Sequence, residues 1–243
     1  MTEAGDIEGA GIGTAIVSYM EPHPGSELEF NRWYERDHFP AAVLAGPGAY
    51  AGQRFVATRR CKIERPPGDL FGDPGTGSYL SVAWLLPGAQ PAWDAWIGPQ
   101  MEMLRREDRM FAGRDHLHTA VYDFVWEARA AGAPPSCVAL DDGATGLVAV
   151  AITGDDTAAE GWANDLAGEG IPLVVGLRRQ RLLVSVLGEP APHLLILAFV
   201  DGDVLDVWRR RAVPALATLR GEFGFASPFF ATVPGTDTYA DQL

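Results

Sequence analysis

The sequence predicts an α+β protein made of two similar units, each with the element order β-α-β-β-α-β. Three observations support this prediction. Segments rich in β-branched and aromatic residues alternate with segments of helical periodicity, a short run of small residues divides the chain, and short matching sequences recur in the same order on both sides of that run. At 243 residues, the chain is long enough to bury a substantial core as one large domain or two small ones.

The first unit is expected to occupy residues 1–130. Its first helix should begin at Ser26, because serine followed by glutamate three residues later forms a capping box. It should end or kink beside His38, since Pro40 has no backbone N–H and disfavours helix at the preceding residue. A second helix should kink or restart at Gly98-Pro99. The expected elements are a strand at 14–20, a helix at 26–39, strands at 50–58 and 79–86, a helix at 93–104 and a strand at 119–126, with a long loop at 64–77.

Residues 131–135 are rich in alanine and proline and are expected to link the first unit to a second, degenerate unit at 136–243. Three short sequences match in the same order between the units, which favours a duplication. The matches are 51–54 with 175–178, 82–84 with 197–199, and 94–96 with 206–208. The expected elements are a strand at 146–153, a helix at 157–167, a strand at 173–183 with room for a hairpin, a strand at 194–200, a helix at 204–219 and a strand at 225–233.

Each unit corresponds to a ferredoxin-like layer, with its helices on one face of an antiparallel sheet. Such a unit leaves the other face of its sheet bare. The two bare faces are buried if the sheets pack against each other within one chain. The predicted fold class is therefore α+β, with two ferredoxin-like repeats forming an intramolecular α/β barrel.

This arrangement resembles the dimeric α/β-barrel superfamily in a tandem-repeat, single-chain form. The first helix is similar to that of EthD-like proteins, in which aromatic residues precede a histidine and a proline. The residues that carry this resemblance are Phe30, Trp33, Tyr34, His38 and Pro40. Members of the superfamily also include polyketide cyclases, muconolactone isomerases and small cofactor-free monooxygenases. The matching helix of the second unit, at 157–166, keeps a tryptophan but lacks histidine and proline, so one site is expected, in the first unit.

Composition and charge argue against several classes of function. The net charge of −13 and the absence of a basic stripe disfavour binding to nucleic acid or to an anionic membrane. The acidic start precedes no apolar run, and the longest apolar runs are strand-sized. We therefore expect a cytoplasmic protein without a signal peptide or a membrane span. Cys61 and Cys137 should then be reduced. A covalent duplication is compatible with either a monomer or a homodimer.

His38 is the strongest catalytic candidate, because an imidazole titrates near neutrality and can accept and return a proton. Tyr34 lies one helical turn earlier and can orient that imidazole or donate to a developing oxyanion. The resemblance implies the same role, since a histidine on this helix is proposed as acid or base in EthD-like enzymes. Trp33 is expected to contact the substrate. The alternative is that His38 caps the helix end, with Trp33 and Tyr34 as ordinary core residues.

Arg54 and Tyr50 lie on the following strand and are candidates for substrate binding. The forked donors of a guanidinium suit an anionic group of a substrate. Tyr50 and Gly52 should share a strand face with Arg54, and the glycine would leave room for a ligand. For Arg54 a structural ion pair is the favoured alternative, in part because Arg178 matches it in the second unit.

His116 and His118 form a second polar cluster. In an extended chain they would share a face, a spacing that some metal sites use. No third ligand is evident nearby, so we expect two loop histidines ahead of a strand and no metal. The glycine-rich segments 9–13 and 72–77 lack the contexts of dinucleotide and phosphate loops, and no cofactor is expected.

The first hypothesis is therefore a small-molecule enzyme that binds an apolar or aromatic, oxygenated compound inside the barrel. His38 would move a proton in an isomerisation, cyclisation, dehydration or cofactor-free oxidation. The second hypothesis is a non-catalytic binding or assembly protein on the same fold. The third is a haem-binding barrel, which requires a histidine that faces a large cavity. An enclosed pocket with converging polar groups around His38 would favour the enzyme.

Overall fold

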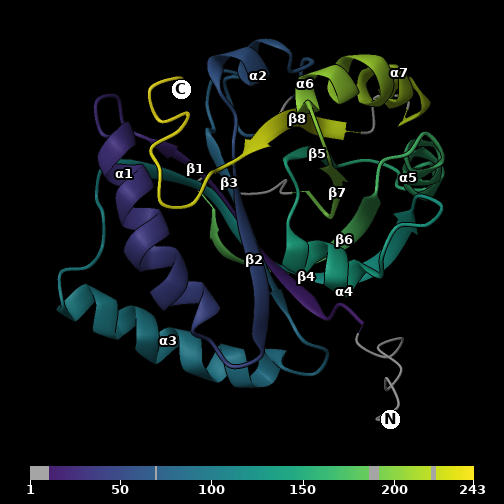
Figure 1. Ribbon diagram of the computed structural model, residues 1–243. Coiled ribbons are helices and arrows are strands. Elements are labelled where there is room, and N and C mark those ends of the chain that lie inside the picture. The colour runs from purple at the N-terminus through teal and green to yellow at the C-terminus, as the bar shows by residue number, and fades with distance from the viewer. Residues whose placement is uncertain (1–10, 69, 186–191, 220–222) are drawn as a thin grey trace, which may run out of the picture.

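In the computed structural model, which describes residues 11–68, 70–185, 192–219 and 223–243, an antiparallel sheet closes into a barrel (Figure 1). The strand order around the barrel is β1-β3-β2-β8-β5-β7-β6-β4. The strands are β1 (Thr14–Pro22), β2 (Ala49–Val56), β3 (Tyr79–Leu85), β4 (Arg114–Arg129), β5 (Gly146–Ile152), β6 (Leu173–Ser185), β7 (Leu194–Val200) and β8 (Phe223–Ala231). The predicted α+β class and the predicted closure into a barrel are confirmed.

Each half of the chain contributes four neighbouring strands with the same internal order. In the first half the order is β4-β1-β3-β2, and in the second half it is β8-β5-β7-β6. The two junctions between these halves differ greatly in length. β4 pairs with β6 from His118 to Arg129, whereas β2 pairs with β8 only through Phe55 and Val56. The descent of the two halves from one repeated unit stays a prediction.

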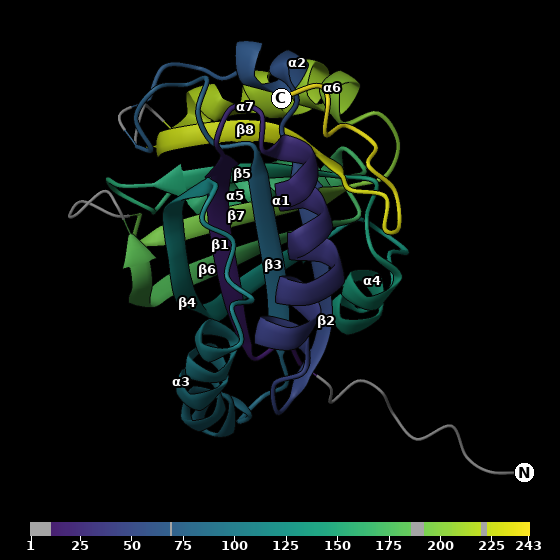
Figure 2. The ribbon, with the colours of Figure 1, turned by 90° about the vertical axis from the view of Figure 1, so that its left-hand side faces the viewer.

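The helices cover the outer face of the barrel in two groups, which Figure 2 shows from the side of α1. The first group packs on the sheet of the first half and the second group on the other sheet, because their apolar faces join separate clusters. The first group is α1 (Glu27–Trp33), η2 (Tyr34–His38), η3 (Pro40–Leu44) and α3 (Gln90–Arg106), and the second is α5 (Ala159–Gly168), α6 (Val204–Val207), η4 (Trp208–Ala212), α7 (Val213–Leu216) and η5 (Ala217–Leu219).

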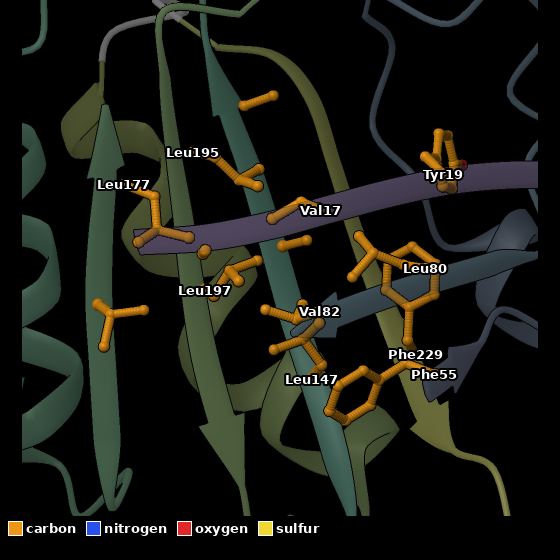
Figure 3. Close-up of a cluster of buried hydrophobic side chains, with 14 of the residues drawn as sticks. Val17, Tyr19, Phe55, Leu80, Val82, Leu147, Leu177, Leu195, Leu197 and Phe229 are labelled. Atoms are coloured by element: carbon orange, nitrogen blue, oxygen red, sulfur yellow. The ribbon is translucent and has the colours of Figure 1, made fainter. Parts of the chain in front are cut away.

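Inward-pointing side chains fill the barrel. Val17, Leu197 and Leu177 point into it from three different strands and belong to one buried cluster (Figure 3). The cavity that lies against Tyr19 and Phe225 inside the barrel has a volume of about 10 Å³. That space is about the size of one water molecule. Close packing of the described apolar residues therefore leaves no room for a substrate at this place in the barrel, and the expectation that a substrate binds inside the barrel is not supported there.

The first helix differs from its prediction at both ends. Ser26 occupies the N-cap position, but its side chain makes no capping hydrogen bond. The helix also continues past His38, as the wide turns of η2 and η3, to Leu44. In these turns the Phe39 N–H donates to the Tyr34 carbonyl five residues earlier. This wider spacing accommodates Pro40 inside the helix, although proline supplies no N–H of its own.

Three further predictions about elements are corrected. α3 does not restart at Gly98-Pro99, because it runs without a break from Gln90 to Arg106, and a kink there stays a prediction. No hairpin interrupts β6. Two short helices were not predicted, α2 (Arg59–Ile63) inside the first unit and α4 (Ser136–Asp142) directly after the predicted linker. Both are shorter than two helical turns and carry too few residues to show a periodic pattern.

We predict that Leu197→Ala lowers the free energy of unfolding by roughly 3 kcal/mol, because it removes buried methyl groups from a filled interior. Leu86→Ala is the matched control, since 44% of the Leu86 side chain is exposed and its loss should cost far less. Urea unfolding of both variants measures the difference. Equal losses in the two variants would contradict the account of a packed barrel.

Candidate functional site

A cavity of about 390 Å³ lies between the outer face of the first sheet and the helices η2, η3 and α3. This volume is within the usual range of small-molecule sites. Its apolar walls come mainly from α3 and η3, and its polar groups come from β1, β4, η2 and the last turn of α3. The polar side chains that line it are Ser18, Tyr34, His38, Arg105, His116 and Thr119. Of these, Tyr34 and His38 were predicted as catalytic residues, and His116 was predicted as part of a second polar cluster.

His38 lines the cavity from the end of η2 and is only 8% exposed. Its ring stacks on Trp33, with 4.4 Å between the ring centroids and 25° between the planes. Its Nδ1 atom is buried and has no hydrogen-bond partner in the described part of the chain. Burial lowers the pKa of His38 to about 4, the positive charges of Arg114 and His116 add to this shift, and Asp37 opposes it. The imidazole is therefore neutral near pH 7 and able to accept a proton.

Tyr34 joins His38 in the same cavity, as the sequence predicted from their helical spacing. The two ring centroids are 5.4 Å apart. The Tyr34 hydroxyl lies 2.8 Å from Ser81 Oγ on β3, and either oxygen is able to donate. Burial raises the pKa of Tyr34, so its hydroxyl stays protonated and remains a hydrogen-bond donor.

On the sheet, three polar side chains that line the cavity form a short hydrogen-bonded chain, which we call the polar wall. Thr119 Oγ1 donates to Ser18 Oγ over 2.9 Å, and His116 Nε2 is hydrogen-bonded to Thr119 Oγ1. Burial, with a further contribution from Arg114, lowers the pKa of His116 to about 4. These residues come from β1 and β4, whose outer faces meet under η2. No sequence motif marks Ser18 or Thr119, since each is a single small polar residue in an apolar strand.

A β-bulge separates the two histidines that were expected to share a face. The pairing register of β4 against β1 shifts between His116 and His118, and Leu117 therefore points inward with His118. His118 Nε2 lies 2.8 Å from the Tyr122 hydroxyl, while His116 faces the cavity on the opposite side of the sheet. The prediction of one shared face is wrong, because the bulge adds a residue to one strand and reverses the alternation. Both histidines also lie in β4 rather than in a loop.

Trp33 packs beside His38 and does not line the cavity. Its Nε1 atom donates to the Arg109 carbonyl over 2.8 Å. The Arg114 guanidinium lies 4.6 Å from the centroid of the Trp33 ring. These contacts fix the plane on which the His38 ring stacks. The position of Trp33 therefore favours a role in orienting His38 over direct contact with a substrate.

Arg54 is 4% exposed and lies behind Tyr34, outside the lining of the cavity. Its guanidinium lies over the rings of Tyr34 and Tyr79, at 4.8 and 5.2 Å from their centroids. It also donates to Asn31 Oδ1 over 3.2 Å and lies 3.7 Å from Glu35 Oε2. These contacts hold the Arg54 guanidinium within the protein, which favours a structural role over substrate binding. Its predicted counterpart, Arg178, forms a more exposed ion pair with Asp156.

Tyr50 lines a separate cavity of about 330 Å³ beside α4. A register shift between Ala49 and Ala51 turns Tyr50 toward the barrel cluster. It therefore does not share a face with Gly52 and Arg54, and this prediction is wrong for the same physical reason as in β4. Gly52 leaves no space for a ligand either. A Cβ atom there would lie 2.6 Å from Leu44 and 2.9 Å from Phe39, so the helix occupies the gap.

Arg114 adds an unbalanced positive charge near the polar wall. It lowers the pKa of both His38 and His116, which shows that its charge acts on the two imidazoles. Its Nε atom is buried without a hydrogen-bond partner, and no carboxylate of the described residues forms an ion pair with it. Burial in turn lowers the pKa of Arg114. A negative charge formed in the cavity would be stabilised by this guanidinium.

Within the described ranges, no three His, Cys, Asp or Glu side chains come together as a group able to hold a metal ion. In the same part of the chain, no helix has the length and apolar character needed to cross a membrane. His23, the remaining histidine of the first half, lies on the surface and pairs with Asp115 over 3.1 Å.

Neither a protein-family model nor a curated protein sequence matches the chain. Solved structures do match over nearly its whole length. A candidate monooxygenase from Fusobacterium nucleatum superposes with a TM-score of 0.51 at 9% identity, covering 92% of this chain and 93% of that one. An anthrone oxidase-like protein gives a TM-score of 0.50 at 8% identity, covering 92% of each chain. A candidate chlorite dismutase gives 0.52 at 8% identity, covering 96% of this chain and all of the other.

The chain has the dimeric α/β-barrel fold. The resemblance stated from the sequence is thereby confirmed at the level of the fold. At 8–9% identity these similarities carry no information about activity. The narrower resemblance of the first helix to EthD-like proteins stays a prediction.

We predict that the protein loses stability as the pH falls from 7 to 5, before most carboxyl groups titrate. His38, His116 and His118 have pKa values of about 4 in the folded chain, below the ordinary value of 6.5. In this interval the unfolded chain binds protons that the folded chain does not bind. Each of these three histidines should therefore lower the free energy of unfolding at pH 5 by about 2 kcal/mol relative to pH 7.

Urea unfolding at several pH values measures this loss. His38→Gln should reduce the slope of stability against pH, because it removes one of the buried imidazoles. His23→Gln is the surface control. A constant free energy of unfolding between pH 7 and 5 would contradict the assignment of neutral, buried histidines.

Proposed function

We propose that the protein is a small-molecule enzyme that catalyses proton transfer on an apolar, oxygenated compound, with His38 as the base. The observation that carries the proposal is the neutral imidazole of His38 in the wall of a largely apolar cavity. A neutral imidazole always has one nitrogen lone pair that accepts a proton. Polar groups also converge on this largely apolar cavity, which supports an enzyme over a binding protein.

The electrostatics of the site favour a substrate that becomes negatively charged. Transfer of a proton from the O–H or activated C–H group of a neutral substrate to His38 creates an imidazolium and an oxyanion. In the empty cavity, burial disfavours the imidazolium. An oxyanion beside it supplies the missing counter-charge, and the protonated Tyr34 hydroxyl and Arg114 stabilise that oxyanion.

The return of the proton to a different atom of the substrate completes an isomerisation, and its delivery to a leaving hydroxyl completes a dehydration. The proposal includes cofactor-free oxidation as a further outcome, in which O₂ would take the electrons of the same anion. Oxidation is also the reaction class named for two structural neighbours, a candidate monooxygenase and an anthrone oxidase-like protein. The haem-binding alternative is tested by an absorbance scan of purified protein in the Soret region. We also propose that residues 131–135 link two units of the chain, and that the first helix is related to that of EthD-like proteins.

We expect His38→Gln to lower kcat by about a hundredfold or more, because glutamine fills similar space but cannot act as a base at neutral pH. His116→Gln tests the neighbouring imidazole, and His23→Gln is the surface control. Circular dichroism of each variant verifies the fold. Full activity of a folded His38→Gln protein would contradict the proposed role.

The pH dependence of kcat/KM gives an independent test, because it reports the pKa of the essential base in the free enzyme. His38 must be neutral to accept a proton, and its pKa is about 4. The rate constant should therefore stay level between pH 7 and 5 and fall only as the pH approaches 4. An acidic limb centred near 6.5, the ordinary pKa of histidine, would rule out a desolvated base.

A further inference from the structure

The cavity opens to solvent beside α3, at a position where that helix carries no side chain. Gly98 lines the cavity and is exposed, in the middle of α3. An ideal Cβ atom built on Gly98 meets no atom within 4 Å outside its two chain neighbours, and its φ angle is not positive. Packing against other elements therefore does not require glycine here, although glycine costs stability inside a helix.

The opposite side of this opening belongs to β6, in the second half of the chain. Leu183 and Val184 line the cavity and are 37% and 43% exposed, which is unusual for large apolar side chains on a strand. Two exposed apolar residues at the edge of an apolar cavity are the expected lining of an entrance for an apolar compound. The second half thus contributes to a site whose candidate catalytic residues all come from the first half.

Contacts between α3 and β6 show where the opening begins. Asp94 on α3 forms an ion pair with Arg181 on β6. From Asp94 to Gly98 the helix rises about 6 Å. From Arg181 to Leu183 the strand advances about 7 Å. The two elements are therefore joined at Asp94 and Arg181, and a few residues further along each chain Gly98 and Leu183 line the same cavity.

Both ends of α3 are fixed, so the helix cannot settle onto the sheet and close the opening. On the N-terminal side Trp93 is 1% exposed and packs against Gly46. On the C-terminal side Leu104 is fully buried. Gln100 also donates to the Ala41 carbonyl over 2.7 Å, which holds α3 at a fixed distance from η3.

We propose that Gly98 is the specificity-determining residue that sets the size of the compound admitted to the cavity. The gap left by its missing side chain, facing Leu183 and Val184, is the entrance. This inference rests on the proposed function, which identifies the cavity as the substrate site. It adds that the size of the entrance selects among substrates. The substrates are apolar, hydroxylated compounds whose polar end lies toward His38 and whose apolar end passes Gly98.

Pro99 supplies a competing, local reason for glycine, because proline disfavours the helical conformation of a preceding residue that has a Cβ atom. The experiment therefore uses two backgrounds, the natural chain and Pro99→Ala. In the Pro99→Ala background no proline constrains the conformation of residue 98. An effect of a Gly98 substitution on binding in that background is therefore due to the size of the entrance.

Binding of 2-naphthol and 9-phenanthrol, hydroxylated compounds of two and three fused rings, is measured by isothermal titration calorimetry. Gly98→Phe should weaken binding of the three-ring compound about tenfold or more, and weaken the two-ring compound much less, in both backgrounds. Gly161→Phe is the matched control. Gly161 lies inside α5, is exposed, has no atom within 4 Å of an ideal Cβ and does not line the cavity.

The outcomes separate this inference from the proposed function. Equal weakening of both compounds, or a loss that disappears with Pro99→Ala, overturns the role of Gly98 and leaves the proposed function standing. Failure of the natural protein to bind either compound overturns both. Size-selective binding in the Gly98 series supports the entrance even if His38→Gln keeps full activity, since calorimetry requires no turnover.

Discussion

Close packing inside the barrel is the constraint on which the rest of the structure depends. Side chains that point inward from both sheets join one buried cluster, and closure of the barrel is what buries them. Where the described interior is filled, a cavity of useful size forms on the outer face of a sheet. On the second sheet the helices pack directly against the strands. On the first sheet the fixed ends of α3 hold that helix away, and the candidate site occupies the space beneath it.

Much of the fold follows from patterns that extend over many residues. The strands were predictable because β-branched residues and turn signals repeat along the chain, and the barrel followed from the need to bury two bare sheet faces. The first helix was also predictable, and its spacing correctly placed Tyr34 and His38 together. Its continuation through Pro40 was not, because wide helical turns depend on tertiary packing and leave no signal in the sequence.

The site was less predictable than the fold, and two β-bulges explain most of the difference. One in β4 turns His116 to the cavity and His118 to the barrel, and one in β2 separates Tyr50 from Arg54. A bulge changes the face of every residue on one side of it, so simple alternation assigns those side chains incorrectly. Ser18, Thr119 and Leu183 could not have been selected at all, since their importance lies only in which elements meet around them.

The unequal junctions of the barrel determine how it would open. β2 and β8 share only two residue pairs, whereas β4 and β6 are joined along most of their length. Separation of β2 from β8 would convert the cylinder into a continuous sheet in the order β2-β3-β1-β4-β6-β7-β5-β8. Such a sheet repeats the same internal strand order on the two sides of the β4–β6 junction, and its two free edges, β2 and β8, are complementary to each other. A second opened chain could therefore pair with both edges and rebuild the same contacts as an exchanged dimer.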